Sequence, residues 1–112
     1  MRTTGVAVVP AYVARDLANL RRAFPEDGQY ARAIIAVASE IQRALAAPRD
    51  FGIELDRELD SWRRSKFPSK NRETADLRLI FRAAGNGGIQ ILAFGDRQFP
   101  DSVYYTAKER AL

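Results

Sequence analysis

The sequence predicts an α+β fold in which an N-terminal strand and a helical hairpin pack on a small, twisted, antiparallel-rich sheet with a short C-terminal helix. Its 112 residues are the length of one domain, so residues 1–112 are assigned to a single unit. Two consecutive stretches carry apolar side chains at helical spacing, and the C-terminal third holds two strand-like runs joined by a turn. Hydrophobic residues make up 46% and charged residues 29% of the chain, a balance typical of globular proteins.

The N-terminal half is predicted to form a short strand and two helices. Residues 5–9 are a β-like apolar run that ends at Pro10. Apolar side chains then recur every three or four residues along 13–24 and again along 30–45. Asp27, in the break between them, is a candidate N-cap of the second helix, which is predicted to end near 47–48. Two amphipathic helices joined by a short break predict an antiparallel hairpin with its apolar stripes in the core.

Residues 49–76 give a mixed signal. Leu55 belongs both to a strand-like alternation with Phe51 and Ile53 and to a helix-like pair with Leu59. The stretch that follows has no clear period. It is interpreted as a loop with an irregular strand, anchored by Trp62 and Phe67.

The C-terminal third is predicted to be a β-hairpin followed by a helix. Residues 77–82 alternate as a half-buried strand, and Asn86, Gly87 and Gly88 supply the turn. The returning strand, 89–94, is mostly apolar and is therefore expected at the centre of the sheet. After Pro100, Asp101 or Ser102 is expected to cap a last helix over 103–110.

The composition excludes several kinds of chemistry. The chain has no His and no Cys, which excludes disulfides, zinc fingers, Cys nucleophiles and Ser-His-Asp triads. Arg, Lys, Tyr and carboxylates remain as the reactive side chains, and no cofactor or metal is expected. No apolar run reaches the length of a membrane span, so a cytoplasmic protein without a membrane partner is expected.

The net charge of +4 lies in one segment. Residues 57–82 contain eight basic and four acidic side chains, which leaves the other 86 residues neutral. Such a concentration indicates either a surface for a polyanion or an ordinary solvated face.

Three segments in the C-terminal half resemble the RelE/ParE toxin superfamily. The first is the strand 76–82, which carries Arg78 inside an apolar run, and the second is the apolar strand 89–97, which ends in Gly-x-Arg at Arg97. The third is the helix 103–110, which reads Val-Tyr-x-x-Ala-x-x-Arg. The resemblance implies a RelE/ParE-like fold and a bacterial toxin of a type II toxin–antitoxin pair, blocked by a cognate antitoxin.

Within this family the resemblance leaves the target open. RelE-type toxins are endoribonucleases (mRNA interferases) that cut mRNA on the ribosome without a metal, whereas ParE-type toxins inhibit DNA gyrase. A catalytically inactive, RNA-binding relative is a third possibility. The RelE-type reading is preferred because the basic segment suits RNA.

For a nuclease, the family motifs imply roles for individual residues. Arg78 would stabilise charge on the phosphate, and Arg97 would act beside the leaving group. Tyr104, or less favourably its neighbour Tyr105, would stack on or orient a nucleotide. Lys70 is closest in spacing to the family's catalytic lysines, although the Lys-x-Lys pattern is missing and Asn71 stands where a second Lys is expected. The residues predicted to bind RNA are Arg63, Arg64, Lys66, Arg72 and Arg82.

Overall fold

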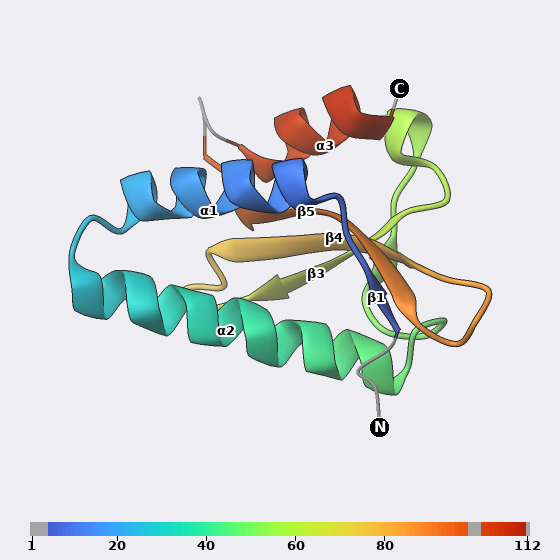
Figure 1. Ribbon diagram of the computed structural model, residues 1–112, viewed down its shortest axis with the longest axis horizontal. Coiled ribbons are helices and arrows are strands. Elements are labelled where there is room, and N and C mark those ends of the chain that lie inside the picture. The colour runs from blue at the N-terminus through green and yellow to red at the C-terminus, as the bar shows by residue number, and fades with distance from the viewer. Residues whose placement is uncertain (1–4, 99–101, 112) are drawn as a thin grey trace.

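A computed structural model describes residues 5–98 and 102–111 of the chain. The described residues form an α+β fold with three α-helices and one five-stranded mixed sheet (Figure 1). In chain order the elements are β1 (Val6–Ala7), α1 (Pro10–Ala23), α2 (Asp27–Ala46), β2 (Ile53–Glu54), the 3-10 turn η1 (Arg57–Leu59), β3 (Arg63–Phe67), β4 (Leu77–Ala83), β5 (Ile89–Asp96) and α3 (Val103–Ala111). In the described part of the chain, no helix is long and apolar enough to cross a membrane.

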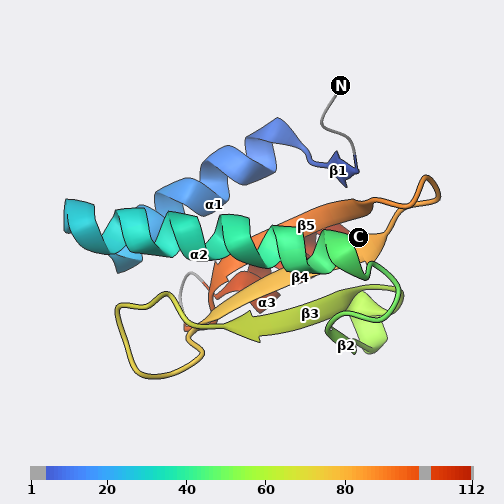
Figure 2. The same cartoon turned by 90° about the horizontal axis from the view of Figure 1, so that it is seen from below.

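The sheet has the strand order β1-β5-β4-β3-β2. Other elements cover both of its faces. Only β1 and β5 pair in parallel, and the other three pairings are antiparallel, as predicted. Helices α1 and α2 pack on one face, and α3 and η1 pack on the other (Figures 1 and 2). The prediction that β4 is half-buried is therefore wrong, because both faces of this strand are buried from Leu77 to Phe81.

The predicted helical hairpin is confirmed, with α1 and α2 antiparallel (Figure 1). Pro10 is the first residue of α1, where its missing N–H costs no helical hydrogen bond. The predicted N-cap of α2 is wrong by one residue. Glu26 occupies the cap position, and Asp27 begins the helix and pairs with Arg21. Its negative charge still complements the helix dipole there.

Residues 49–76 are more regular than their sequence predicts. They contain two strands and one 3-10 turn, and β3 pairs in continuous register with β4. The predicted anchors are both buried, but on opposite faces of the sheet. Trp62 packs with Leu59 and Ile80 beneath α3, whereas Phe67 lies in the core under the helical hairpin.

The C-terminal hairpin is confirmed, and its turn depends on glycine. Gly87 adopts a φ of 85°, in the left-handed region that glycine enters without steric cost. A side chain on Gly88 would collide with the backbone of Gly5, the residue just before β1, whose carbonyl accepts a hydrogen bond from the backbone N–H of Ile89. Of the two caps expected for α3, Asp101 lies outside the described residues, and the carbonyl of Ser102 accepts a hydrogen bond from the backbone of Thr106.

Candidate functional site

A groove of about 530 Å³ opens at the end of the sheet where β4 begins and β5 ends. Four of its lining residues are cationic and two are acidic. The lining residues are Lys66, Arg72, Thr74, Ala75, Asp76, Arg78, Asp96, Arg97 and Gln98. The groove therefore brings together four of the basic residues that the sequence singles out, from two strands, the loop before β4 and the segment after β5.

The register of the sheet places the central cations of this groove. Lys66 of β3 lies directly opposite Arg78 of β4, which in turn lies opposite Gly95 of β5. Directly opposed residues on antiparallel strands project from the same face, so Lys66 and Arg78 share the face on which α3 packs. Arg97 follows β5 directly and is exposed.

Arg78 is the most constrained of these cations, with only 3% of its surface exposed. Its Nε donates a hydrogen bond to the Tyr104 hydroxyl at 3.1 Å. Its Nη1 donates to the carbonyls of Ala75 at 2.5 Å and Leu77 at 2.9 Å. All three acceptors are neutral, and no carboxylate among residues 5–98 and 102–111 forms an ion pair with Arg78. A buried guanidinium without a carboxylate partner is a strong attractor for an anion.

Lys66 experiences the combined field of its neighbours. The positive charge of Arg64 lowers the pKa of the Lys66 ammonium, and Arg78, partial desolvation and Arg97 lower this pKa further. Like charges disfavour the protonated form, so the lowered pKa reflects the three arginines that surround Lys66.

Tyr104 and Tyr105 have different environments on α3. Tyr104 is half-buried and its hydroxyl holds Arg78, whereas Tyr105 is 55% exposed. Tyr104, the tyrosine preferred from the sequence, is thus the one that contacts a groove residue, although it does not line the groove itself. Its contact orients an arginine, and the ring is partly covered by the packing of α3.

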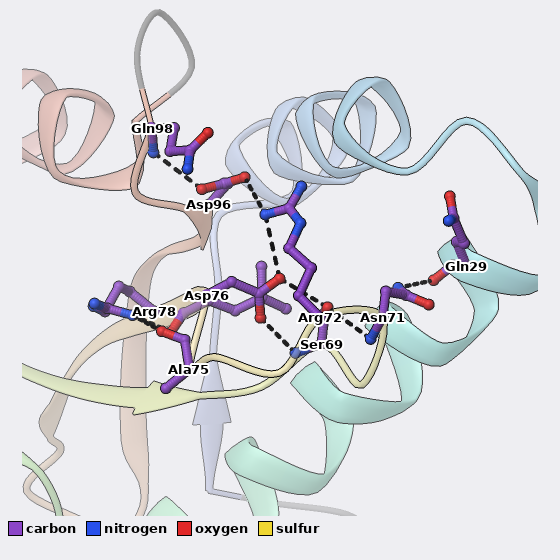
Figure 3. Close-up of polar contacts among 10 residues, drawn as sticks. Gln29, Ser69, Asn71, Arg72, Ala75, Asp76, Arg78, Asp96 and Gln98 are labelled. Atoms are coloured by element: carbon purple, nitrogen blue, oxygen red, sulfur yellow. Dashed lines mark hydrogen bonds and ion pairs between the residues drawn. The ribbon is translucent and has the colours of Figure 1, made fainter.

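Arg72 lines the groove, but its charge is neutralised there. Its Nη1 lies 3.4 Å from a carboxylate oxygen of Asp76 and 3.2 Å from one of Asp96 (Figure 3). Its guanidinium also lies over the ring of Phe24, 4.8 Å from the centroid. Asp76 in turn accepts hydrogen bonds from the backbone N–H and the hydroxyl of Ser69, at 2.7 and 2.8 Å, which fixes the loop before β4.

The predicted base Lys70 and its neighbour Asn71 both lie in that loop. Lys70 is exposed, with a φ of 68°, and is not among the residues that line the groove. Asn71, which stands in place of the expected second Lys, anchors the loop to α2. Its amide nitrogen donates to the carbonyl of Gln29 at 2.7 Å (Figure 3). Its side-chain oxygen accepts from Nε of Arg32, also at 2.7 Å.

The remaining predicted RNA-binding residues lie toward the other end of β3 and β4. Arg63 donates to the backbone carbonyls of residues 50, 51 and 52 and to the carboxylate of Glu54, so it has a structural role. Arg64 is half-buried and lies on the same face as Lys66. Arg82 is exposed and lies over the ring of Trp62.

An internal ion pair that supports the groove is absent from the sequence-based predictions. Arg110 binds both carboxylate oxygens of Asp16 at 2.8 and 2.9 Å, and the backbone N–H of Phe94 donates to the same carboxylate. This buried pair ties α1, β5 and α3 together, although burial raises the pKa of Asp16 above its ordinary value. The sequence contains one sign of this buried pair, because Asp16 falls on the apolar stripe of its helix, between Val13 and Leu20.

The chemistry of the groove is that of an anion site. Lys66 and Arg97 line the groove and have no carboxylate partner in the described chain. They share the groove with the buried guanidinium of Arg78, whose Nη2 donates none of the hydrogen bonds described above. Within the described ranges no group of three or more Asp, Glu, His or Cys residues could hold a metal ion. Comparisons of the chain with protein-family models, with curated proteins and with solved structures find no match.

Proposed function

We propose that this protein is a toxin that binds RNA through the groove and cleaves it by attack of the RNA's own 2′-hydroxyl. The observation that carries the proposal is Arg78, a buried guanidinium with only neutral partners, which faces Lys66 and Arg97 in one groove. A planar guanidinium with free donors matches two phosphate oxygens. The RelE-type resemblance of the same strand and helix agrees with this chemistry.

The proposed reaction moves one proton and exchanges one P–O bond for another. A base removes the proton from the 2′-hydroxyl, its oxygen attacks phosphorus, and the bond from phosphorus to the 5′-oxygen breaks as that oxygen takes up a proton. The products are a 2′,3′-cyclic phosphate and a 5′-hydroxyl end. Charge builds on the phosphate oxygens during attack, and fixed cations lower the barrier most when they are already in place.

The geometry supports Lys66 rather than Lys70 as the base. Lys66 lines the groove opposite Arg78, and its lowered pKa increases the neutral fraction that can accept a proton. Arg78 would hold the phosphate oxygens, and Arg97 would stabilise the departing 5′-oxygen. Tyr104 is a positioning residue because it holds Nε of Arg78.

The substrate and partners follow from the same proposal. The substrate is mRNA bound to the ribosome, and a cognate antitoxin would block the groove with acidic side chains that occupy the place of phosphate. A cytoplasmic location suits both. Neither the inactive, RNA-binding alternative nor a gyrase target is favoured by a specific feature of the groove.

Controlled expression in a bacterium tests the proposal. We expect growth arrest together with new mRNA 5′ ends at codons that ribosomes occupy, and we expect Arg97→Ala to abolish both. Arg15→Ala, which removes an exposed charge from α1, is the matched control and should leave both unchanged. Intact mRNA together with loss of DNA supercoiling would show a gyrase inhibitor instead, and wild-type cleavage by the Arg97→Ala variant would remove Arg97 from the mechanism.

A further inference from the structure

A second cavity, of about 450 Å³, lies at the opposite end of β3 and β4 from the groove. Its lining includes Trp62, three arginines (Arg49, Arg63 and Arg82) and two carboxylates (Glu54 and Asp60). The guanidinium of Arg82 lies 4.3 Å from the centroid of the Trp62 ring, and its Nε donates to the side-chain oxygen of Gln90 at 2.9 Å. Trp62 is only 7% exposed, whereas Arg82 is exposed. The arginine is therefore a fixed, planar cation that lies between the indole and solvent.

The second cavity and the groove lie along one face of the sheet. Arg82 follows Arg78 by four residues on β4, so both side chains project from the same face, roughly 13 Å apart along the strand. Between them on the neighbouring strand is Arg64, which shares the face of Lys66. In the described chain neither Arg64 nor Lys66 forms an ion pair with a carboxylate. Cations thus continue from the groove toward the second cavity.

Arg82 differs from the other well-fixed arginine of this cavity. The guanidinium of Arg63 is engaged by three backbone carbonyls and by Glu54. Arg82 has one hydrogen bond and one ring contact, both of which set the orientation of its plane and leave its outer side exposed. Guanidinium planes stack on unpaired bases, and a side chain that is already ordered loses little conformational entropy on binding.

We propose that the Trp62–Arg82 pair is a base-stacking subsite for the single-stranded RNA that flanks the phosphate bound at Arg78. This inference rests on the proposed function, because it takes RNA as the ligand of the groove. The subsite sets the direction in which the RNA runs from the groove and the length of RNA that binds most tightly. RNA long enough to reach from the groove past Arg64 to Arg82 gains a stacked base, whereas an RNA that fills the groove alone does not.

Binding of two single-stranded RNAs tests the subsite. A trinucleotide fills the groove, and an octanucleotide also reaches Arg82; both are made non-cleavable by 2′-O-methylation and are titrated at the same salt concentration. Stacking of one base strengthens binding by about ten-fold, so we expect the octanucleotide to bind about that much more tightly. Trp62 is the single tryptophan, so its fluorescence reports this subsite, and we expect a change in emission with the octanucleotide only.

Charge-conserving variants separate stacking from simple attraction. Arg82→Lys keeps the charge and loses the plane, so we expect it to remove most of the length advantage and leave trinucleotide binding unchanged. Arg15→Lys on α1 is the matched control and should change neither. A length advantage that survives in Arg82→Lys, or equal fluorescence changes with both RNAs, would overturn the subsite and leave the groove intact. Lys66→Ala tests separately whether the groove binds RNA. If this variant binds both RNAs as tightly as wild type does, the proposed function is wrong, and the subsite is wrong with it.

Discussion

Arg78 is unusual among buried arginines because its hydrogen-bond acceptors are two carbonyls and a hydroxyl. A buried charge is normally paired, because desolvation of an isolated ion is costly. Here the cost is reduced by neutral dipoles on one side of the guanidinium, and the other side lines the groove. At the level of single residues, this arrangement is the basis on which we propose that the groove binds an anion.

The pKa of Lys66 depends most on Arg64, and this dependence can be measured. Removal of a neighbouring positive charge stabilises the ammonium, so Arg64→Gln should raise the pKa of Lys66. The pH dependence of labelling by an amine-reactive reagent, followed by mass spectrometry, reports this pKa directly. We expect the Lys66 curve to move to higher pH in the Arg64→Gln variant.

We also expect the Arg64→Gln variant to cleave RNA at a different rate. With a higher pKa, a smaller fraction of Lys66 is neutral at pH 7, so RNA cleavage should slow and its rising limb should move to higher pH. An unchanged labelling curve would contradict the electrostatic coupling, and an unchanged rate profile with a shifted curve would exclude Lys66 as the base.

The hydroxyl of Tyr104 is expected to stabilise both the fold and the site. Tyr104→Phe removes the acceptor for Nε of Arg78, and loss of a hydrogen bond to a charged group costs about 1–2 kcal/mol in the free energy of unfolding. RNA affinity should fall as well, because Arg78 loses its orientation. Tyr30→Phe, which removes a hydroxyl from a partly buried ring on α2, is the control. Equal stability and affinity in the Tyr104 variant and wild type would show that Arg78 is held by its carbonyl contacts alone.

The four cations of the groove could be predicted from the sequence, but the residues that hold them in place could not, for a physical reason. Arg78, Arg97 and Tyr104 lie in segments with recognisable patterns, so they could be predicted. The preference for Lys70 over Lys66 came from spacing along the chain. Spacing does not reveal which residue stands opposite Arg78, because that depends on the register between β3 and β4.

At the scale of elements, β3 was the least predictable strand and matters most to the site. Its sequence is mainly polar, and only Ser65 and Phe67 are buried within it. A strand whose other face carries Arg64 and Lys66 beside a groove has no apolar alternation to detect. The helices α1 and α2 and the hairpin of β4 and β5 were predictable because each has a long apolar face against the core.

Helix α3 carries Tyr104 to Arg78, and its position depends on a buried ion pair. Asp16→Asn would leave Arg110 charged and without its carboxylate, a change that costs about 3 kcal/mol or more when one partner of a buried pair is removed. We expect denaturant unfolding to show this loss and RNA binding to weaken at the same time. Asp27→Asn disrupts the exposed pair with Arg21 and is the control, for which little change is expected. A loss of stability with wild-type RNA affinity would show that α3 holds its place without the pair.

At the scale of the whole molecule, the strand order explains why the site lies where it does. The central strand β4 begins at the groove. Its two neighbours, β5 and β3, run antiparallel to it and both end at the same edge. The spacing of apolar side chains predicted an α+β domain and the charge distribution predicted a basic segment, but neither could predict this convergence. Contacts between residues as far apart as Asp16 and Arg110 arise only when the chain is folded.

In the proposed mechanism, the groove directs the 2′-hydroxyl of RNA against its own phosphate. The most direct measurement is cleavage of a defined mRNA on purified ribosomes, beside the same mRNA with a single 2′-deoxy substitution at the cut site. We predict cleavage of the unmodified mRNA, with a 2′,3′-cyclic phosphate on the upstream product and a 5′-hydroxyl on the downstream product, and no cut at the substituted position. Cleavage that persists at the 2′-deoxy position, or unmodified mRNA that stays intact with folded protein, would rule out this mechanism.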